Sequence, residues 1–249
     1  MWHTGRSPFL PPTQEVALKR ELMVDTQRIQ NAPQCIAGLA RIAAQLASKS
    51  SNRCVNVLQV ATYVPLDVET VGRMLESLRE REDVSVVEHD GFEHICFENP
   101  ESFFSGPSTL ETQDHLLHNA SLLKQLSLLR EDPAWVRQVE LQHALLRAVA
   151  KTRKTRLTLD FFQDALDFPA TLIKSTLGDL CANAHSHTEI DARDRMVYTF
   201  PPLDYPSERY RQNMELLSNL PTPYSANLMV WGVLALVVAL AVFGLVWKM

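Results

Sequence analysis

The sequence predicts a mainly helical α+β protein followed by one membrane-spanning helix, and three features of the chain support this fold class. Apolar residues recur at helical spacing through most of residues 1–225. Glycine is rare, with 8 among 249 residues, and the alternating pattern of β-strands is confined to two short stretches. Residues 228–247 are apolar on every side of a helix, which suits lipid better than the surface of a soluble domain.

The first 34 residues are expected to form a proline-rich leader and an amphipathic helix. Thr13 is placed to cap this helix, and Pro33 ends it. A second helix is predicted over residues 35–50, because its apolar side chains again repeat at helical spacing.

Residues 35–99 predict a unit of helices that ends in a β-hairpin. Asn56 is placed to cap a short helix that Pro65 stops, and Asp67 is placed to cap the next one. Over residues 84–97 the apolar residues alternate instead, around the turn-forming pair Asp-Gly. A hairpin is therefore expected directly after the third helix of the unit.

The order of helix, short extended piece, helix, turn, helix and hairpin resembles the winged-helix fold, a helix-turn-helix core with a two-stranded wing. A shift of 102 residues aligns a second copy without gaps. Apolar residues coincide at Val55/Leu157, Val57/Leu159, Val60/Phe162, Val64/Leu166, Leu66/Phe168, Val71/Ile173, Leu75/Leu177 and Leu78/Leu180. Thr158 stands where Asn56 stands, and both residue types are good helix caps. The resemblance implies tandem winged-helix units over residues 35–99 and 132–202, and a generic helical domain with two β-hairpins is the alternative.

Two connecting segments complete the part of the chain before the apolar stretch. Residues 100–131 predict a loop and a long leucine-rich helix that packs on one or both units. Residues 203–225 predict a short tether, so the second unit should lie near a bilayer surface.

The apolar stretch within residues 226–249 predicts a transmembrane helix. Its 20 residues from 228 to 247 give a length of about 30 Å, the thickness of the hydrocarbon core of a bilayer. Tryptophans near both ends suit the headgroup regions, and a lysine follows that can reach water. Residues expected to mark this anchor are Leu228, Trp231, Gly232, Ala235, Ala239, Phe243, Trp247 and Lys248. The small pair Ala235 and Ala239 makes a homodimer possible through this helix.

The position of the anchor leads to an expected topology. The opening residues MWHTGRSPFLPP contain no long apolar region, so no secretory signal is expected. The chain is therefore expected to be tail-anchored and single-pass, with its soluble region in the cytoplasm. In that compartment Cys35, Cys54, Cys96 and Cys181 are expected to be reduced and mostly buried.

The charge of the chain argues against nucleic acid as a partner. The formal net charge is −5, and the predicted third helix of the first unit carries Glu69, Glu76 and Glu80. Winged helices that bind DNA use the third helix and the wing, where phosphates call for Lys and Arg. The corresponding helix of the second unit offers only Lys174 among charged residues on its expected outer face.

One basic cluster interrupts this acidic chain, with Lys151, Arg153, Lys154 and Arg156 in the stretch KTRKTR. Three interpretations are open: a solvated loop where cations suit a helix C-terminus, a contact with anionic lipid headgroups, or a contact with an acidic partner or nucleic acid.

No catalytic, cofactor-binding or metal-binding residues are predicted, because no nucleophile elbow, phosphate-binding loop or zinc-ligand spacing occurs. The sequence thus favours a non-enzymatic scaffold or adaptor at a membrane, with the lipid bilayer and an unidentified cytosolic protein as partners. The alternative is a membrane-bound DNA-binding transcription regulator.

Overall fold

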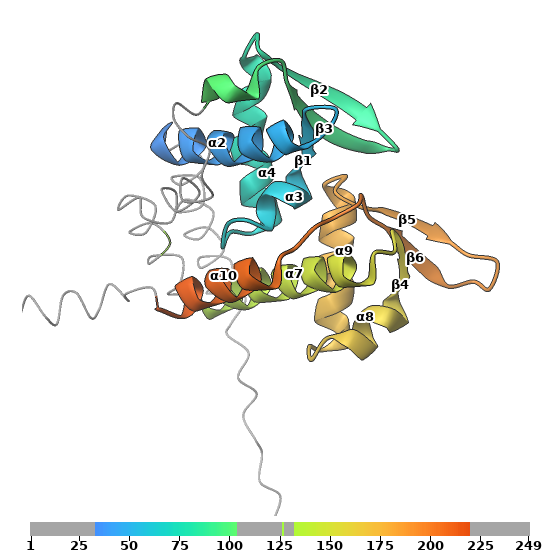
Figure 1. Cartoon of the computed structure of the whole chain (residues 1–249). Helices are drawn as coiled ribbons and strands as arrows, with labels where there is room; N and C mark the ends of the chain where they lie inside the picture. The colour runs from blue at the N-terminus through green and yellow to red at the C-terminus, as the bar shows by residue number, and fades with distance from the viewer. Residues whose placement is uncertain (1–32, 104–125, 127–131, 220–249) are drawn as a thin grey trace, which may run out of the picture.

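The computed structural model describes residues 33–103, 126 and 132–219 of the chain. These residues form two units with the same order of elements, which lie one above the other with their hairpins on the same side (Figure 1). The predicted leader helix, most of the predicted linker over 100–131 and the whole expected membrane anchor lie outside the described residues.

The first unit combines helices with one small sheet. It contains α2 (Pro33–Lys49), β1 (Cys54–Asn56), α3 (Val57–Ala61), α4 (Val68–Glu76), the 3₁₀ helix η1 (Ser77–Glu80), β2 (Val84–His89), β3 (Phe92–Phe97) and the 3₁₀ helix η2 (Pro100–Phe103).

The second unit repeats this order and adds a final helix. It contains α7 (Pro133–Thr152), β4 (Arg156–Thr158), α8 (Leu159–Ala165), α9 (Ala170–Ala182), β5 (His187–Ile190), β6 (Met196–Thr199) and α10 (Ser207–Asn219). Helix α10 returns from the second sheet to lie beside α7 (Figure 1).

Each unit closes with a three-stranded antiparallel sheet. The strand orders are β1-β3-β2 and β4-β6-β5, so the short strand before the second helix of each unit pairs with the last strand of its hairpin. The described residues therefore confirm a mixed α+β protein with two hairpins at the predicted places. The repeated order also shows that the match in sequence pattern is a match in structure.

Local chemistry explains where the short helices begin. The side chains of Asn56 and Asp67 accept backbone N–H bonds at the first turns of α3 and α4, and Thr158 does the same for α8. These three caps are the predicted ones. Helix α2 begins at Pro33 rather than after it, since proline fits the first turn of a helix as well as it ends one.

The first hairpin has a two-residue turn. His89 pairs with Phe92, and Asp90 and Gly91 between them have φ angles of 53° and 80°. Two positive φ angles match the twist of the strands, and the Asp-Gly pair adopts them at low cost.

A single apolar core runs through both units. The buried side chains of α2, α4, α7, α9 and both sheets form one connected cluster. In the second unit, the fully buried ring of Phe162 packs edge-on against Tyr198 and Phe200, with centroids 6.4 and 6.0 Å apart. Burying a side chain of this size contributes roughly 2–3 kcal/mol, so the shared core holds the two units as one body.

The expectation of four reduced cysteines is wrong for two of them. Cys54 and Cys96 stand opposite each other on β1 and β3, with Cα atoms 4.0 Å apart, and form a disulfide. Their separation of 42 residues hides this pairing in the sequence, because only the sheet register brings them together. Cys35 and Cys181 are free, and Cys35 is buried.

No helix among residues 33–103 and 132–219 is long and apolar enough to cross a membrane. Leu228, Trp247 and the other residues of the predicted anchor lie outside the described residues.

Candidate binding surface

The two units meet at a joint of buried polar contacts between α7 and the start of α4. The N–H of Val68 donates to Oε1 of Gln142 across 2.9 Å, and Nε1 of Trp135 donates to Asp67 across 3.2 Å. Gln142, Asp67 and Trp135 are all buried. In each contact one unit provides the hydrogen-bond donor and the other provides the acceptor. Because these groups are buried, any other arrangement of the two units would leave them without a partner.

A hydrogen-bonded chain through His143 extends this joint into α10. The imidazole Nε2 lies 3.1 Å from the carbonyl of Leu66, and Nδ1 lies 2.5 Å from the hydroxyl of Tyr205. A carbonyl can only accept, so Nε2 carries the proton and Tyr205 donates to Nδ1. Asn213 then donates from Nδ2 to the Tyr205 oxygen and to the carbonyl of Thr62.

Burial fixes the charge state of this chain. Loss of water lowers the pKa of His143 from 6.5 to about 4, against a smaller opposite effect of the Leu66 carbonyl. Burial also raises the pKa of Tyr205 well above its usual range. His143 and Tyr205 are therefore both neutral at physiological pH, and this series of hydrogen bonds serves to connect the units.

One side of α4 contacts the second unit, while Arg73 and Glu76 of the same helix are exposed. Gly72 of α4 lies beside His185, whose ring atoms would stand 3.5 Å from an added Cβ. The pKa of Asp179 in α9 is raised, mainly by partial burial and to a smaller extent by the negative charge of Glu69 in α4. The space left between α4 and the loop after α9 has a volume of only about 230 Å³.

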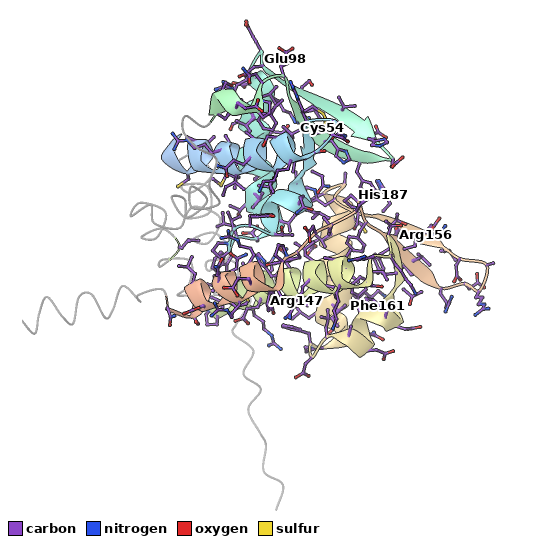
Figure 2. The ribbon with its side chains drawn as sticks, in the orientation of Figure 1. Cys54, Glu98, Arg147, Arg156, Phe161 and His187 are labelled. Carbon is purple, nitrogen blue, oxygen red and sulfur yellow. A yellow bond between two sulfur atoms is a disulfide. The ribbon has the colours of Figure 1, made fainter. Side chains whose placement is uncertain are left out.

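The turn of the first hairpin also contacts the second unit. His187, which Figure 2 places between the two units, lies with Nε2 2.5 Å from the carbonyl of Gly91. Its ring stacks on Phe92 at a centroid distance of 4.6 Å. The carbonyl of Gly91 and the ring of Phe92 therefore contact the second unit, whereas His89 and Asp90 at the same turn are exposed.

The open surface of the second unit is different in charge. At the C-terminal end of α7, Arg147, Lys151, Arg153 and Lys154 are all exposed. Within residues 33–103 and 132–219, none of these four cations forms an ion pair with a carboxylate. Arg153 follows the last residue of α7 with a φ of 56°, which turns the chain out of the helix.

Three of the four residues of the predicted basic cluster therefore come together, and the fourth does not. Arg156 begins β4 and forms an ion pair with Glu189 of β5, on the hairpin side of the unit and away from Arg147 (Figure 2). The strand explains this separation, because it turns Arg156 toward the neighbouring hairpin. Arg147 takes its place, one helical turn before Lys151.

These cations border two adjoining depressions, which we call the basic groove. The first, of about 690 Å³, lies between α7, α8 and α10 and is lined by Arg147, Lys151 and three aromatic side chains, Phe161, Phe168 and Tyr210. The second, of about 780 Å³, lies against the segment from Pro201 to Ser207 and is lined by all four cations. Arg147 and Lys151 belong to both depressions.

The basic groove can bind an anion beside an apolar group. The Arg147 guanidinium stacks over the Tyr210 ring at 4.4 Å, which orients its N–H groups without using them. Two carboxylates, Asp167 and Asp204, also line the depressions, so the cations remain in excess. In the part of the chain that the structure describes, no group of three or more His, Cys, Asp or Glu side chains is placed to hold a metal ion.

Sequence reasoning missed Arg147 and the aromatic lining of the groove. The spacing of Arg147 and Lys151, four residues apart on a predicted helix, could have joined them. Tyr210 could not be found this way, because it arrives from α10, more than fifty positions later. No model of a known protein family matches the chain, and no curated protein is similar to it.

Proposed function

We propose that the chain is a membrane-attached, non-enzymatic adaptor, in which two winged-helix units form one platform for a protein partner at the cytoplasmic face. The order of elements and the strand orders in each unit support the winged-helix assignment. The uniformly apolar residues 228–247 support the attachment to a bilayer.

The observation that carries the adaptor proposal is that α4 and the first hairpin turn each contact the second unit. In a winged helix that binds DNA, the third helix enters the major groove and needs room for a duplex. Here Gly72 and Gly91 lie against His185 and His187 of the second unit instead. In the first unit, these two elements contact the second unit of the same protein.

The second unit keeps its third helix open, and its charge again favours protein over DNA. Thr171, Lys174 and Ser175 of α9 are exposed, which gives one cation on that face. On the hairpin Arg195 is paired with Asp191, and on β4 Arg156 is paired with Glu189 of the hairpin, so these two cations are already neutralised.

A gel-shift assay separates the adaptor from the alternative, a membrane-bound transcription regulator. The full chain in detergent micelles is titrated into labelled genomic DNA fragments at low salt. The adaptor proposal expects no retarded complex. Tight binding that weakens steeply as salt is added would show counterion release from phosphates and would overturn the proposal in favour of the regulator.

A further inference from the structure

The basic groove has the features of a peptide site, and three observations define them. It combines four cations that form no ion pair with any carboxylate of the described residues and a floor of half-buried aromatic and aliphatic side chains. Its two depressions, of about 690 and 780 Å³, are each of the size that encloses a few side chains. Arg147 connects them, held in place by the Tyr210 ring.

The cations of the basic groove and its apolar floor would bind different parts of one ligand. Charge-assisted hydrogen bonds from arginine and lysine are strongest to carboxylates and phosphates. Phe161 and Phe168 are only partly covered, so an apolar group that lies on them removes their remaining surface from water. The ligand therefore carries negative charge directly beside an apolar side chain.

The shape of the groove favours a peptide over the surface of a bilayer. A flat bilayer contacts protruding side chains, whereas the groove is recessed between α7, α8 and α10. Helix α10 begins at the groove with Ser207 and runs 13 residues, or about 20 Å, before the chain leaves at Asn219. The groove thus lies at the N-terminal end of α10, and Asn219 ends the helix at its other end.

We propose that the basic groove binds a short acidic segment of a partner protein, with carboxylates on Arg147, Lys151, Arg153 and Lys154 and an adjacent aromatic or leucine side chain on Phe161 and Phe168. This inference rests on the adaptor function and names the chemistry of its partner. It goes beyond a general attraction of opposite charges, because it requires both parts of the ligand.

The test uses the full chain in nanodiscs of uncharged lipid and a set of labelled synthetic peptides. In the probe peptides, Asp and Glu alternate with Phe and Leu. In one control set Asn and Gln replace the acids, and in the other Ser replaces the apolar residues. The inference expects saturable binding of probe peptides, with a loss of about tenfold or more in affinity for each control set.

Matched variants assign the binding to the groove. Arg147→Gln with Lys151→Gln should weaken the binding of the probe peptides about tenfold or more. Lys174→Gln with Arg193→Gln removes the same charge from exposed positions outside the groove and should leave binding unchanged. Phe168→Ser tests the apolar floor, and circular dichroism confirms that each variant is folded.

Four results would overturn the inference: no binding of the probe peptides, equal binding of the Asn and Gln peptides, equal weakening by both pairs of variants, or tight Arg147-dependent binding of anionic lipid nanodiscs or duplex DNA in place of peptide. If the chain remains membrane-bound and fails to shift DNA while the peptides do not bind, only the groove assignment fails. The adaptor function itself fails through the gel-shift result.

Discussion

The hydroxyl of Tyr205 donates a hydrogen bond to Nδ1 of the fully buried His143 across 2.5 Å, at the point where the two units meet. This contact joins the segment before α10 to α7, and the other side of the imidazole reaches Leu66 of the first unit. The polar joint adds specific hydrogen bonds to the apolar core that the two units share, and single substitutions can test it directly.

Tyr205→Phe should lower the free energy of unfolding by about 1–3 kcal/mol, because it leaves Nδ1 of His143 buried without a partner. Denaturant unfolding followed by circular dichroism measures this change. Tyr210→Phe is the matched control, since the ring of Tyr210 contacts Arg147 and the hydroxyl is not needed for that contact. Equal effects of the two variants would contradict the role of the joint.

Stability should depend on pH through the buried histidines. Burial lowers the pKa of His143 and of His185 to about 4, so the unfolded chain binds protons more readily than the folded one. The free energy of unfolding is then greatest above pH ~6.5 and falls as the pH drops toward 4, by up to about 3 kcal/mol for His143. His143→Gln should flatten this dependence when denaturant unfolding is repeated across this pH range, and an unchanged slope would contradict the role of its burial.

Three glycines should respond differently to alanine. At Gly72 and Gly178 an added Cβ meets ordinary contacts or open space, so alanine should stabilise helices α4 and α9 by about 0.5–1 kcal/mol each. At Gly91 the φ of 80° and a Cβ only 3.0 Å from His187 should cost roughly 1–2 kcal/mol. Thermal melts of the three variants check the order, and a stabilising Gly91→Ala would contradict the turn.

The disulfide should be detectable by thiol counting. Purified protein unfolded without reductant should expose two thiols, from Cys35 and Cys181, and four after reduction. Cys54→Ser should destabilise the protein by about 4 kcal/mol in the chain-entropy model, because it opens a loop of 42 residues.

Thiol trapping in intact cells connects the disulfide with topology. The structure pairs Cys54 with Cys96, whereas the cytoplasm keeps thiols reduced, so the state of these two residues in cells tests the proposed cytoplasmic face. An intact disulfide in untreated cells would contradict the proposed cytoplasmic face and place the soluble region in an oxidising compartment.

The membrane attachment can be tested by charge at the middle of the apolar stretch. Leu236→Arg with Val237→Arg should release the chain from carbonate-washed membranes, because each arginine costs about 3 kcal/mol at the centre of a span. Leu236→Phe with Val237→Leu is the apolar control and should leave the chain in the membrane pellet. Retention of the arginine variant would place the attachment elsewhere.

The sequence was sufficient for features that depend on neighbouring residues. The caps at Asn56, Asp67 and Thr158 and the Asp-Gly turn follow from local hydrogen bonding and φ preferences, and the structure has all four. The repeat was also visible, because apolar spacing survives when residue identity does not.

Features that depend on residues far apart could not be predicted in this way. The disulfide needs the register of β1 on β3, and the groove needs α10 to bring Tyr210 to Arg147. The basic cluster was predicted as four neighbours, yet strand β4 removes Arg156 from the group. Residues that are neighbours in the sequence share a surface only where the backbone between them does not change direction.

The contacts between the two units also determine when the first unit can finish folding during synthesis. The amide of Gln59 exchanges two hydrogen bonds with the backbone of Asp204, 145 residues later, and Asn213 reaches Thr62 across 151 residues. During synthesis the first unit must therefore wait, with this face unfilled, until almost all of the described chain has been made. Pairing over such distances is slow, so the exposed face of α3 is where a half-made chain would need protection from aggregation.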